Sequence, residues 1–218
     1  QEQQYENDTI TPVKSFTGHT GEVHCVLVNH KNVGRSVNQI VTCGSDNTIK
    51  TWDVVSGTCI HTFTSNRPMR TLAWWKQGQY LIEAGVNIHI RKWNHQYYTS
   101  EDHCKILTTL KGHTSLVCNL LVDDSSDRLL SSSTDGAIIM WDLNTGKELK
   151  QFKGYSGVVS ALCKLNKNVF ASAGVDKSVM IKFWDMTSGK CILAVDDAHS
   201  NVIRSLLYSA SNKVLITT

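Results

Sequence analysis

The stretch GHTSLVCNLLVDDSSDRLLSSSTDGAIIMWD at residues 112–142 decides the fold. It begins with a Gly-His dipeptide, ends with Trp-Asp, and carries short apolar runs separated by Asp, Ser and Gly residues. Short apolar runs bounded by turn residues are typical of β-strands. The stretch therefore predicts a small unit of antiparallel strands rather than a pair of helices.

The same unit recurs along the chain. Four of the six tryptophans recur at intervals of 41, 48 and 43 residues, and three of these four precede an aspartate. Recurrence at an interval of about 20–50 residues is the signature of a repeat architecture, and short strands between turns indicate propeller blades. The recurring pieces are Trp52, Trp93, Trp141 and Trp184, the dipeptides Gly18-His19 and Gly112-His113 with the variants Gly154-Tyr155 and Ala198-His199, and the blocks IVTCGSD at 40–46, LLSSSTD at 129–135 and VFASAGVD at 169–176.

This pattern resembles the WD-repeat family, whose unit runs from Gly-His to Trp-Asp. The resemblance covers nearly the whole chain and implies an all-β fold, a WD-repeat β-propeller with four recognisable four-stranded blades and part of a fifth. Because the last unit lacks a third strand and a Trp, we expect an incomplete ring and a fragment of a longer chain. The expected parts are a polar tail at 1–9 and a propeller at 10–218, with an outermost strand at 10–16, blades at about 17–63, 64–110, 111–152 and 153–195, and a partial blade at 196–218.

The repeated polar residues are expected to form one buried hydrogen-bonded network in each regular blade. Buried imidazole, carboxylate and indole groups are costly unless paired, and a complete network specifies one strand register. Repetition in successive units argues against a Ser-His-Asp catalytic triad, so no catalytic residue is assigned. Carried over to this sequence, the resemblance implies a structural role for His19, Thr42, Asp46 and Trp52, for His113, Ser131, Asp135 and Trp141, and for Ser172, Asp176 and Trp184.

Two blades depart from this pattern. In the second, Glu83 and Asn87 stand where Ser and Asp are expected, and only Trp93 remains. Glu83 is then either solvated in the central channel or paired with a neighbour. In the fourth, Tyr155 replaces the His, and the interval from the aspartate to the tryptophan is eight residues where the regular blades have six. A bulge or a longer turn is expected to absorb the two extra residues.

The resemblance implies a partner-binding face at the turns before the first strand and after the second strand of each blade. This set is more apolar than a solvated rim requires, and its two arginines supply charge-assisted donors. One interpretation is that the face takes an extended segment whose acidic or phosphorylated residue pairs with an arginine. The other is that its valines complete the packing around the channel. The residues are Glu22, His24, Ser45, Pro68, Arg70, Val86, Leu116, Cys118, Thr134, Val158, Ser160, Val175, Val202 and Arg204.

A second candidate surface lies on the opposite face. The insertions are NHKNVGRSVNQ at 29–39 and HQYYTSEDHC at 95–104, and the resemblance implies that they emerge on the same side of the first two blades. Insertions displayed on one face of a repeat protein often mark a binding surface, although long loops can also be idle.

Composition narrows the function classes. The net charge of +3 is too small to indicate nucleic-acid binding, and no apolar run is long enough for a membrane helix. Seven cysteines without a C-x-x-C motif indicate neither a disulfide framework nor a zinc site, so no metal or cofactor is expected, and the compartment is expected to be cytoplasmic or nuclear. We therefore expect a non-catalytic scaffold that binds other proteins or peptides within a multiprotein complex. Alternatives are the substrate-recruiting half of a ubiquitin ligase or a kinase-associated protein, a propeller enzyme, and an RNA-associated protein.

Overall fold

The computed structural model describes residues 14–28, 39–65, 67–93, 105–176 and 178–218. The described residues form strands and turns and no helix, so none of them provides a helix that could span a membrane. They make four antiparallel sheets of four strands and one sheet of two. We call the four sheets blades 1 to 4 and the two-stranded sheet the fifth unit.

The strands of each blade follow one another in the sheet in chain order. Blade 1 contains β1 (Val23–Val28), β2 (Gln39–Gly44), β3 (Thr48–Asp53) and β4 (Cys59–Thr64). Blade 2 contains β5 (Thr71–Trp75), β6 (Tyr80–Ala84), β7 (Ile88–Lys92) and β8 (Ile106–Leu110). Blade 3 contains β9 (Val117–Asp123), β10 (Arg128–Ser133), β11 (Ala137–Asp142) and β12 (Glu148–Lys153). Blade 4 contains β13 (Val159–Lys164), β14 (Val169–Val175), β15 (Val179–Asp185) and β16 (Cys191–Val195), and the fifth unit contains β17 (Leu206–Ser209) and β18 (Val214–Thr217).

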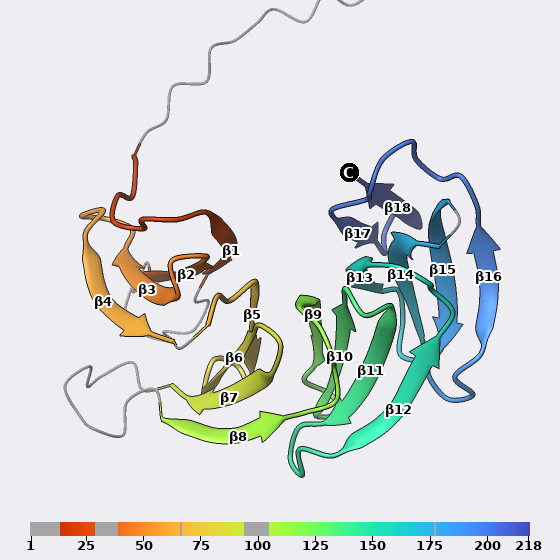
Figure 1. The fold of residues 1–218 in the computed structure, drawn as a ribbon, viewed down its shortest axis with the longest axis horizontal. Helices are drawn as coiled ribbons and strands as arrows, with labels where there is room; N and C mark the ends of the chain where they lie inside the picture. Colours follow the sequence, from red (N-terminus) through yellow and green to blue (C-terminus); the bar gives the residue numbers. More distant parts are fainter. Residues whose placement is uncertain (1–13, 29–38, 66, 94–104, 177) are drawn as a thin grey trace, which may run out of the picture.

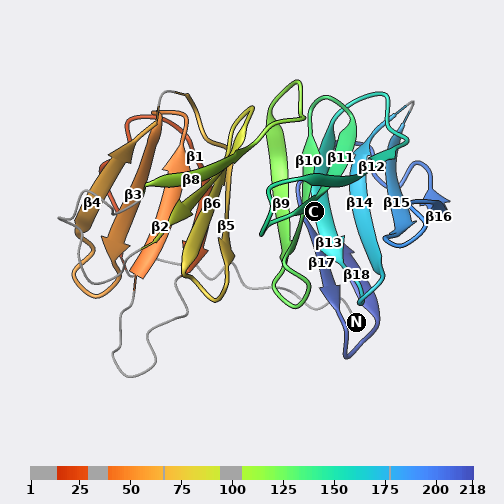
Figure 2. The same cartoon turned by 90° about the horizontal axis from the view of Figure 1, so that it is seen from below.

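The blades are arranged around an arc. Figure 1 shows the first strand of each blade nearest the middle and the fourth strand at the outside, with an opening between blade 1 and the fifth unit. Seen from the side, the strand ends gather at two opposite faces of the arc (Figure 2). This is the arrangement of propeller blades, and the ring is not closed.

Buried apolar layers join each blade to the next. Alternate residues of a strand point to opposite faces of the sheet, so one strand serves two layers. In β10, Leu129 packs in the layer toward blade 2, and Leu130 packs in the layer toward blade 4. The tryptophans fill these layers, because Trp141 is 1% exposed between blades 2 and 3 and Trp184 is 2% exposed between blades 3 and 4.

Blade 2 has a different register from the one that the tryptophan spacing predicts. In blade 1, Trp52 pairs with the residue two before Thr42. In blade 2 the corresponding residue, two before Glu83, is Leu81, and it pairs with Arg91. Arg91 therefore occupies the position of the network tryptophan, and the prediction that Trp93 remains there is wrong. The innermost pair of the β6–β7 hairpin, Ala84↔Ile88, encloses three residues, whereas Cys43↔Ile49 in the β2–β3 hairpin encloses five. This difference of two residues leaves Trp93 beyond the end of β7.

Two other expectations change in detail. The two extra residues of blade 4 lengthen the β14–β15 hairpin, which stays paired without a bulge from Val169↔Asp185 to Val175↔Val179. The outermost strand expected at 10–16 is not formed by residues 14–16, and residues 10–13 lie outside the described part of the chain. The polar tail at 1–9, the insertion at 95–104 and nearly all of the insertion at 29–39 also lie outside the described residues.

Candidate functional site

Blades 1 and 3 each contain a four-membered hydrogen-bonded network. In blade 3, Trp141 Nε1 donates to Ser131 Oγ at 2.8 Å, and His113 lies between Ser131 at 2.7 Å and Asp135 at 3.0 Å. In blade 1 the corresponding distances are 2.8 Å from Trp52 to Thr42, 2.6 Å from Thr42 to His19 and 2.8 Å from His19 to Asp46.

The donors and acceptors of this network run in one direction. The indole N–H can only donate, so it uses a lone pair of the hydroxyl oxygen. The hydroxyl hydrogen is then directed to His Nε2, and His Nδ1–H donates to the aspartate, which is the arrangement of a neutral imidazole. Every member of the network is satisfied, so the network positions the turn of each blade.

The network aspartates also hold the chain that leads into each blade. Burial alone would raise the pKa of Asp46, but hydrogen bonds from Thr48, the Thr20 amide and His19 outweigh it and hold the pKa well below its usual value. Asp135 behaves in the same way, with bonds from two backbone amides and from the imidazole of its network. These carboxylates are anchors of the backbone.

In blade 4 the polar residues form two separate hydrogen-bonded clusters instead of one network. Tyr155 Oη lies 2.9 Å from Ser172 Oγ, which also accepts a 2.8 Å bond from Trp184 Nε1. Asp176 instead accepts a 2.6 Å bond from Ser156 and lies 3.7 Å from Lys182 Nζ. Burial raises the pKa of Tyr155 to about 12, so the tyrosine is a neutral hydrogen-bonding residue. Asp176 therefore belongs to a second cluster rather than to a single tetrad with Ser172 and Trp184.

The fifth unit contains the beginning of a further network, which the sequence analysis did not assign. His199 Nε2 lies 2.6 Å from Thr217 Oγ1. Thr217 pairs with Leu206 as Thr42 pairs with Val26 in blade 1. The signal in the sequence was an apolar run ending in Thr, downstream of the Ala-His variant of the dipeptide.

In blade 2 an ion pair replaces the bond between the hydroxyl and the tryptophan. Arg91 Nη2 donates to Glu83 Oε1 at 2.9 Å, and the side chains are 14% and 1% exposed. Of the two alternatives for Glu83, the structure shows pairing with a neighbour. The other carboxylate oxygen, Oε2, accepts no hydrogen bond from any described residue.

The face predicted to bind a partner is built in the same way in successive blades. The turn before the first strand crosses closely over the end of the second strand, where a glycine gives it room. An added Cβ at Gly44, Gly85 or Gly174 would lie 2.5–2.7 Å from a carbonyl oxygen of that turn. The Ser45, Thr134 and Val175 amides then donate to the Glu22, Leu116 and Val158 carbonyls. This packing brings the two turns of each blade to one face.

Exposure divides the predicted face into two groups. Glu22, Ser45, Pro68, Arg70, Val202 and Arg204 are exposed, whereas His24, Val86, Leu116, Cys118, Thr134, Val158, Ser160 and Val175 are partly buried. Ser160 donates to the Ile203 carbonyl, so its hydroxyl joins blade 4 to the fifth unit. None of the four valines belongs to the buried core clusters found among the described residues.

Arg70 reaches across a blade boundary. Burial raises the pKa of the Cys118 thiol, and the positive charge of Arg70 opposes that rise, so the arginine of blade 2 lies near the first strand of blade 3. Its backbone amide is held by the Ala84 carbonyl at 2.9 Å. A fixed backbone with an exposed guanidinium group suits recognition of a carboxylate or phosphate.

A comparison with known protein families matches the two blades that have complete networks. A family model described as "WD domain, G-beta repeat" matches residues 10–53 and 104–142. These two segments therefore carry WD repeats. The matched segments contain the complete networks of blades 1 and 3, and most of the irregular blades 2 and 4 lies outside them.

Curated relatives match most of the chain. "Ribosome biogenesis protein YTM1" of Candida albicans is 28% identical over 177 residues, which cover 78% of this chain and 36% of that protein. "Protein tipD" of Dictyostelium discoideum is 26% identical over 207 residues, covering 94% and 32%. "Cell division cycle 20.4, cofactor of APC complex" of Arabidopsis thaliana is 28% identical over 227 residues, covering 97% and 49%. The chain therefore spans about a third to a half of the length of these relatives.

Proposed function

We propose that this chain is a non-catalytic module that binds other polypeptides as part of a multiprotein assembly in the cytoplasm or nucleus. The observation that carries the proposal is the face where the WD blades bring their turns together, with partly buried valines beside the exposed Arg70 and Arg204. Apolar surface with a few arginines is typical of the residues that dominate binding energy in protein interfaces.

The polar chemistry of the blades supports a structural role rather than catalysis. In His19 and His113 both ring nitrogens are engaged within the networks, so neither imidazole is available as a general base. One relative is named as the cofactor of a complex, which fits a chain that acts through binding.

The chemistry of the face favours an extended segment with an acidic or phosphorylated residue. Arg70 and Arg204 are both exposed, and each has its backbone amide bonded to a carbonyl of the same sheet unit, at 2.9 Å and 2.6 Å. A guanidinium group pairs with carboxylate or phosphate through two parallel hydrogen bonds. Val86, Val158 and Val175 would provide the apolar surface between these two charges.

Substitution of the two arginines tests the proposal. Partners would be identified by affinity capture on the full-length protein with quantitative mass spectrometry, and each purified partner would then be titrated. Arg70→Ala and Arg204→Ala are each expected to weaken binding by about tenfold or more, the loss caused by one dominant interface residue. Arg128→Ala is the matched control, because Arg128 is exposed but begins β10 at the other end of its blade. Unchanged affinity in both variants would contradict the proposed face.

A further inference from the structure

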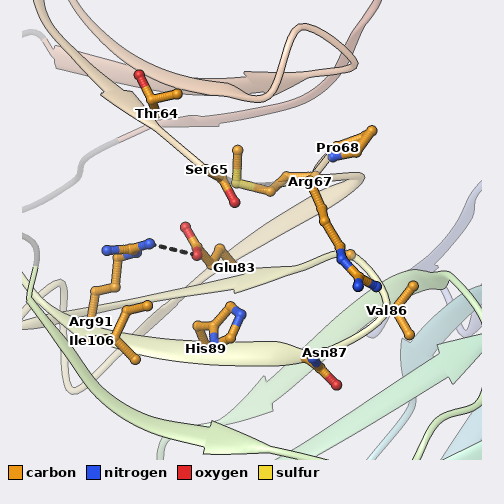
Figure 3. A pocket seen from close by; sticks show the side chains of 12 residues that line it. Thr64, Ser65, Arg67, Pro68, Glu83, Val86, Asn87, His89, Arg91 and Ile106 are labelled. Atoms are coloured by element: carbon orange, nitrogen blue, oxygen red, sulfur yellow. Dashed lines mark hydrogen bonds and ion pairs between the residues drawn. The ribbon is translucent and has the colours of Figure 1, made fainter.

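A pocket of about 420 Å³ lies in blade 2 beside the proposed binding face. Its lining comes from the segment before β5, from the β6–β7 turn and from the ends of β4 and β8. Pro68 and Val86 belong both to the pocket and to the face. The volume falls within the range of about 300–1,000 Å³ that is usual for binding pockets. Figure 3 shows the Glu83 carboxyl group and its Arg91 partner among the lining side chains.

The pocket lies where the regular blades hold a histidine. In blades 1 and 3 the segment before the first strand brings an imidazole to the hydroxyl of the second strand. In blade 2 the corresponding segment has the sequence SNRP at 65–68 and supplies no imidazole, while Glu83 stands at the position of the hydroxyl. Blade 2 therefore has a side chain at the position of the hydroxyl but lacks the imidazole that binds this position in blades 1 and 3.

A carboxylate at this position can only accept hydrogen bonds, whereas the hydroxyl of the regular blades can also donate one. Ser131 accepts from an indole and still has a hydrogen to donate to its histidine. Glu83 accepts from Arg91 in the same way, but a carboxylate has no hydrogen to pass on. Its Oε2 atom is buried in the pocket wall without a hydrogen bond from any described residue. A buried acceptor of this kind is left unsatisfied unless a donor enters the pocket.

The surrounding charges select the kind of donor. Arg91 already pairs with the carboxylate, and a second guanidinium group, that of Arg67, also lines the pocket, so a cationic side chain would meet two like charges. An acidic side chain would meet Glu83. Burial lowers the pKa of His89 in the lining, so that imidazole adds no positive charge near neutral pH. An uncharged group with one N–H donor and one acceptor fits both the carboxylate and the donors of Arg67 and Asn87.

We propose that this pocket receives a neutral imidazole, the histidine side chain of a bound partner polypeptide, which donates its N–H to Glu83 Oε2. The inference rests on the proposed function, because it adds a side-chain pocket to the same partner-binding face. Within the chain, the histidines of blades 1 and 3 are the precedent for an imidazole at this position.

Two small probes test the pocket separately from any partner. 4-Methylimidazole reproduces the histidine side chain, and 1,4-dimethylimidazole is its control without the N–H. Binding would be followed by NMR on the full-length protein at an alkaline pH, where both imidazole probes are neutral. For a fragment of about six heavy atoms, a dissociation constant on the order of 1–10 mM is expected, with the control about tenfold weaker. Equal binding of the two probes, or no binding of 4-methylimidazole in this range, would overturn the proposal.

Two variants show that the signal comes from the pocket. Val86→Trp fills the opening and leaves the ion pair in place, and Glu83→Leu with Arg91→Met removes the acceptor without stranding a buried charge. Both variants are expected to weaken the binding of 4-methylimidazole about tenfold. Unchanged probe binding in both would overturn the site.

Partner titration separates this inference from the proposed function. If Val86→Trp weakens probe binding and partner binding together, the partner inserts a side chain into the pocket. If Val86→Trp blocks the probe while partner affinity stays unchanged and still depends on Arg70, the proposed face stands and the histidine insertion is overturned. If partner binding depends on neither Arg70 nor Arg204, the proposed function fails, whatever the probes show.

Discussion

Replacing Trp141 by alanine is expected to lower the free energy of unfolding by about 3–5 kcal/mol, the range seen when a large buried aromatic side chain is truncated. Trp141 is 1% exposed and packs in the layer that joins blades 2 and 3. Its Nε1 atom donates to Ser131, so the substitution also removes a member of the blade 3 network. Both losses act on the same interface between blades.

The measurement is urea denaturation followed by circular dichroism, with the wild type as reference. Trp141→Phe keeps a six-membered aromatic ring but loses the donor and part of the buried volume, so it should fall between alanine and the wild type. Leu149→Ala is the control in the same blade, because Leu149 is 45% exposed on β12 and should change stability by no more than about 0.5 kcal/mol. A Trp141→Ala effect as small as that of Leu149→Ala would show that the tryptophan does not support the interface.

Replacing Arg91 by methionine is expected to lower the free energy of unfolding by about 3–5 kcal/mol, because it leaves Glu83 buried without its cation. The side chain of Glu83 is only 1% exposed, and its interaction with Arg91 is the ion pair that replaces the hydroxyl–tryptophan bond of the other blades. An uncompensated buried charge is far more costly than the loss of a surface ion pair.

The double variant Glu83→Leu with Arg91→Met distinguishes this cause from lost packing. Replacing both members of a buried pair by apolar residues of similar size is often neutral, so most of the stability should return. The same urea denaturation of Arg91→Met, Glu83→Leu and the double variant yields the coupling between the two positions. If the double variant is as unstable as Arg91→Met alone, the ion pair is not the source of the loss.

The regular blades could be predicted closely from the sequence because their networks repeat with the same spacing. Six residues separate the aspartate from the tryptophan in blades 1 and 3, and the structure brings both sets within hydrogen-bonding distance. The resemblance to WD repeats also predicted which turns lie together, because blades with the same strand order bring the corresponding turns to one side.

The second blade could not be predicted in the same way, because a shift of two residues in strand register leaves every side chain on the same face of the sheet. Arg91 and Trp93 have the same parity in β7 and its continuation, so both registers present the same alternation of apolar and polar residues. The interval of six residues from Asn87 to Trp93 favoured the wrong register. Only the strand pairing shows that Arg91 lies opposite Leu81, two residues before Glu83, where the other blades have a tryptophan at the opposite position.

Parity also explains why blade 4 tolerates two extra residues. An even insertion in a hairpin keeps every side chain on its own face, so the Ser172–Trp184 bond survives while the hairpin extends. The lengthened hairpin moves Asp176 to a separate cluster with Ser156. The pocket of blade 2 could not be predicted from the sequence for a different reason. It exists because the segment before β5 brings no imidazole to Glu83, and this depends on the three-dimensional packing.

The most direct test of the account is hydrogen–deuterium exchange of the full-length protein with and without a captured partner. We predict slower exchange in the bound state for the backbone amides of Arg67, Met69 and Arg70 and of residues 85–87, where the proposed face meets the pocket. The turns at 76–79, 124–127 and 144–147 lie at the other ends of the strands and should not change. Slower exchange confined to those three turns would contradict the account, because it would place the partner on the opposite face.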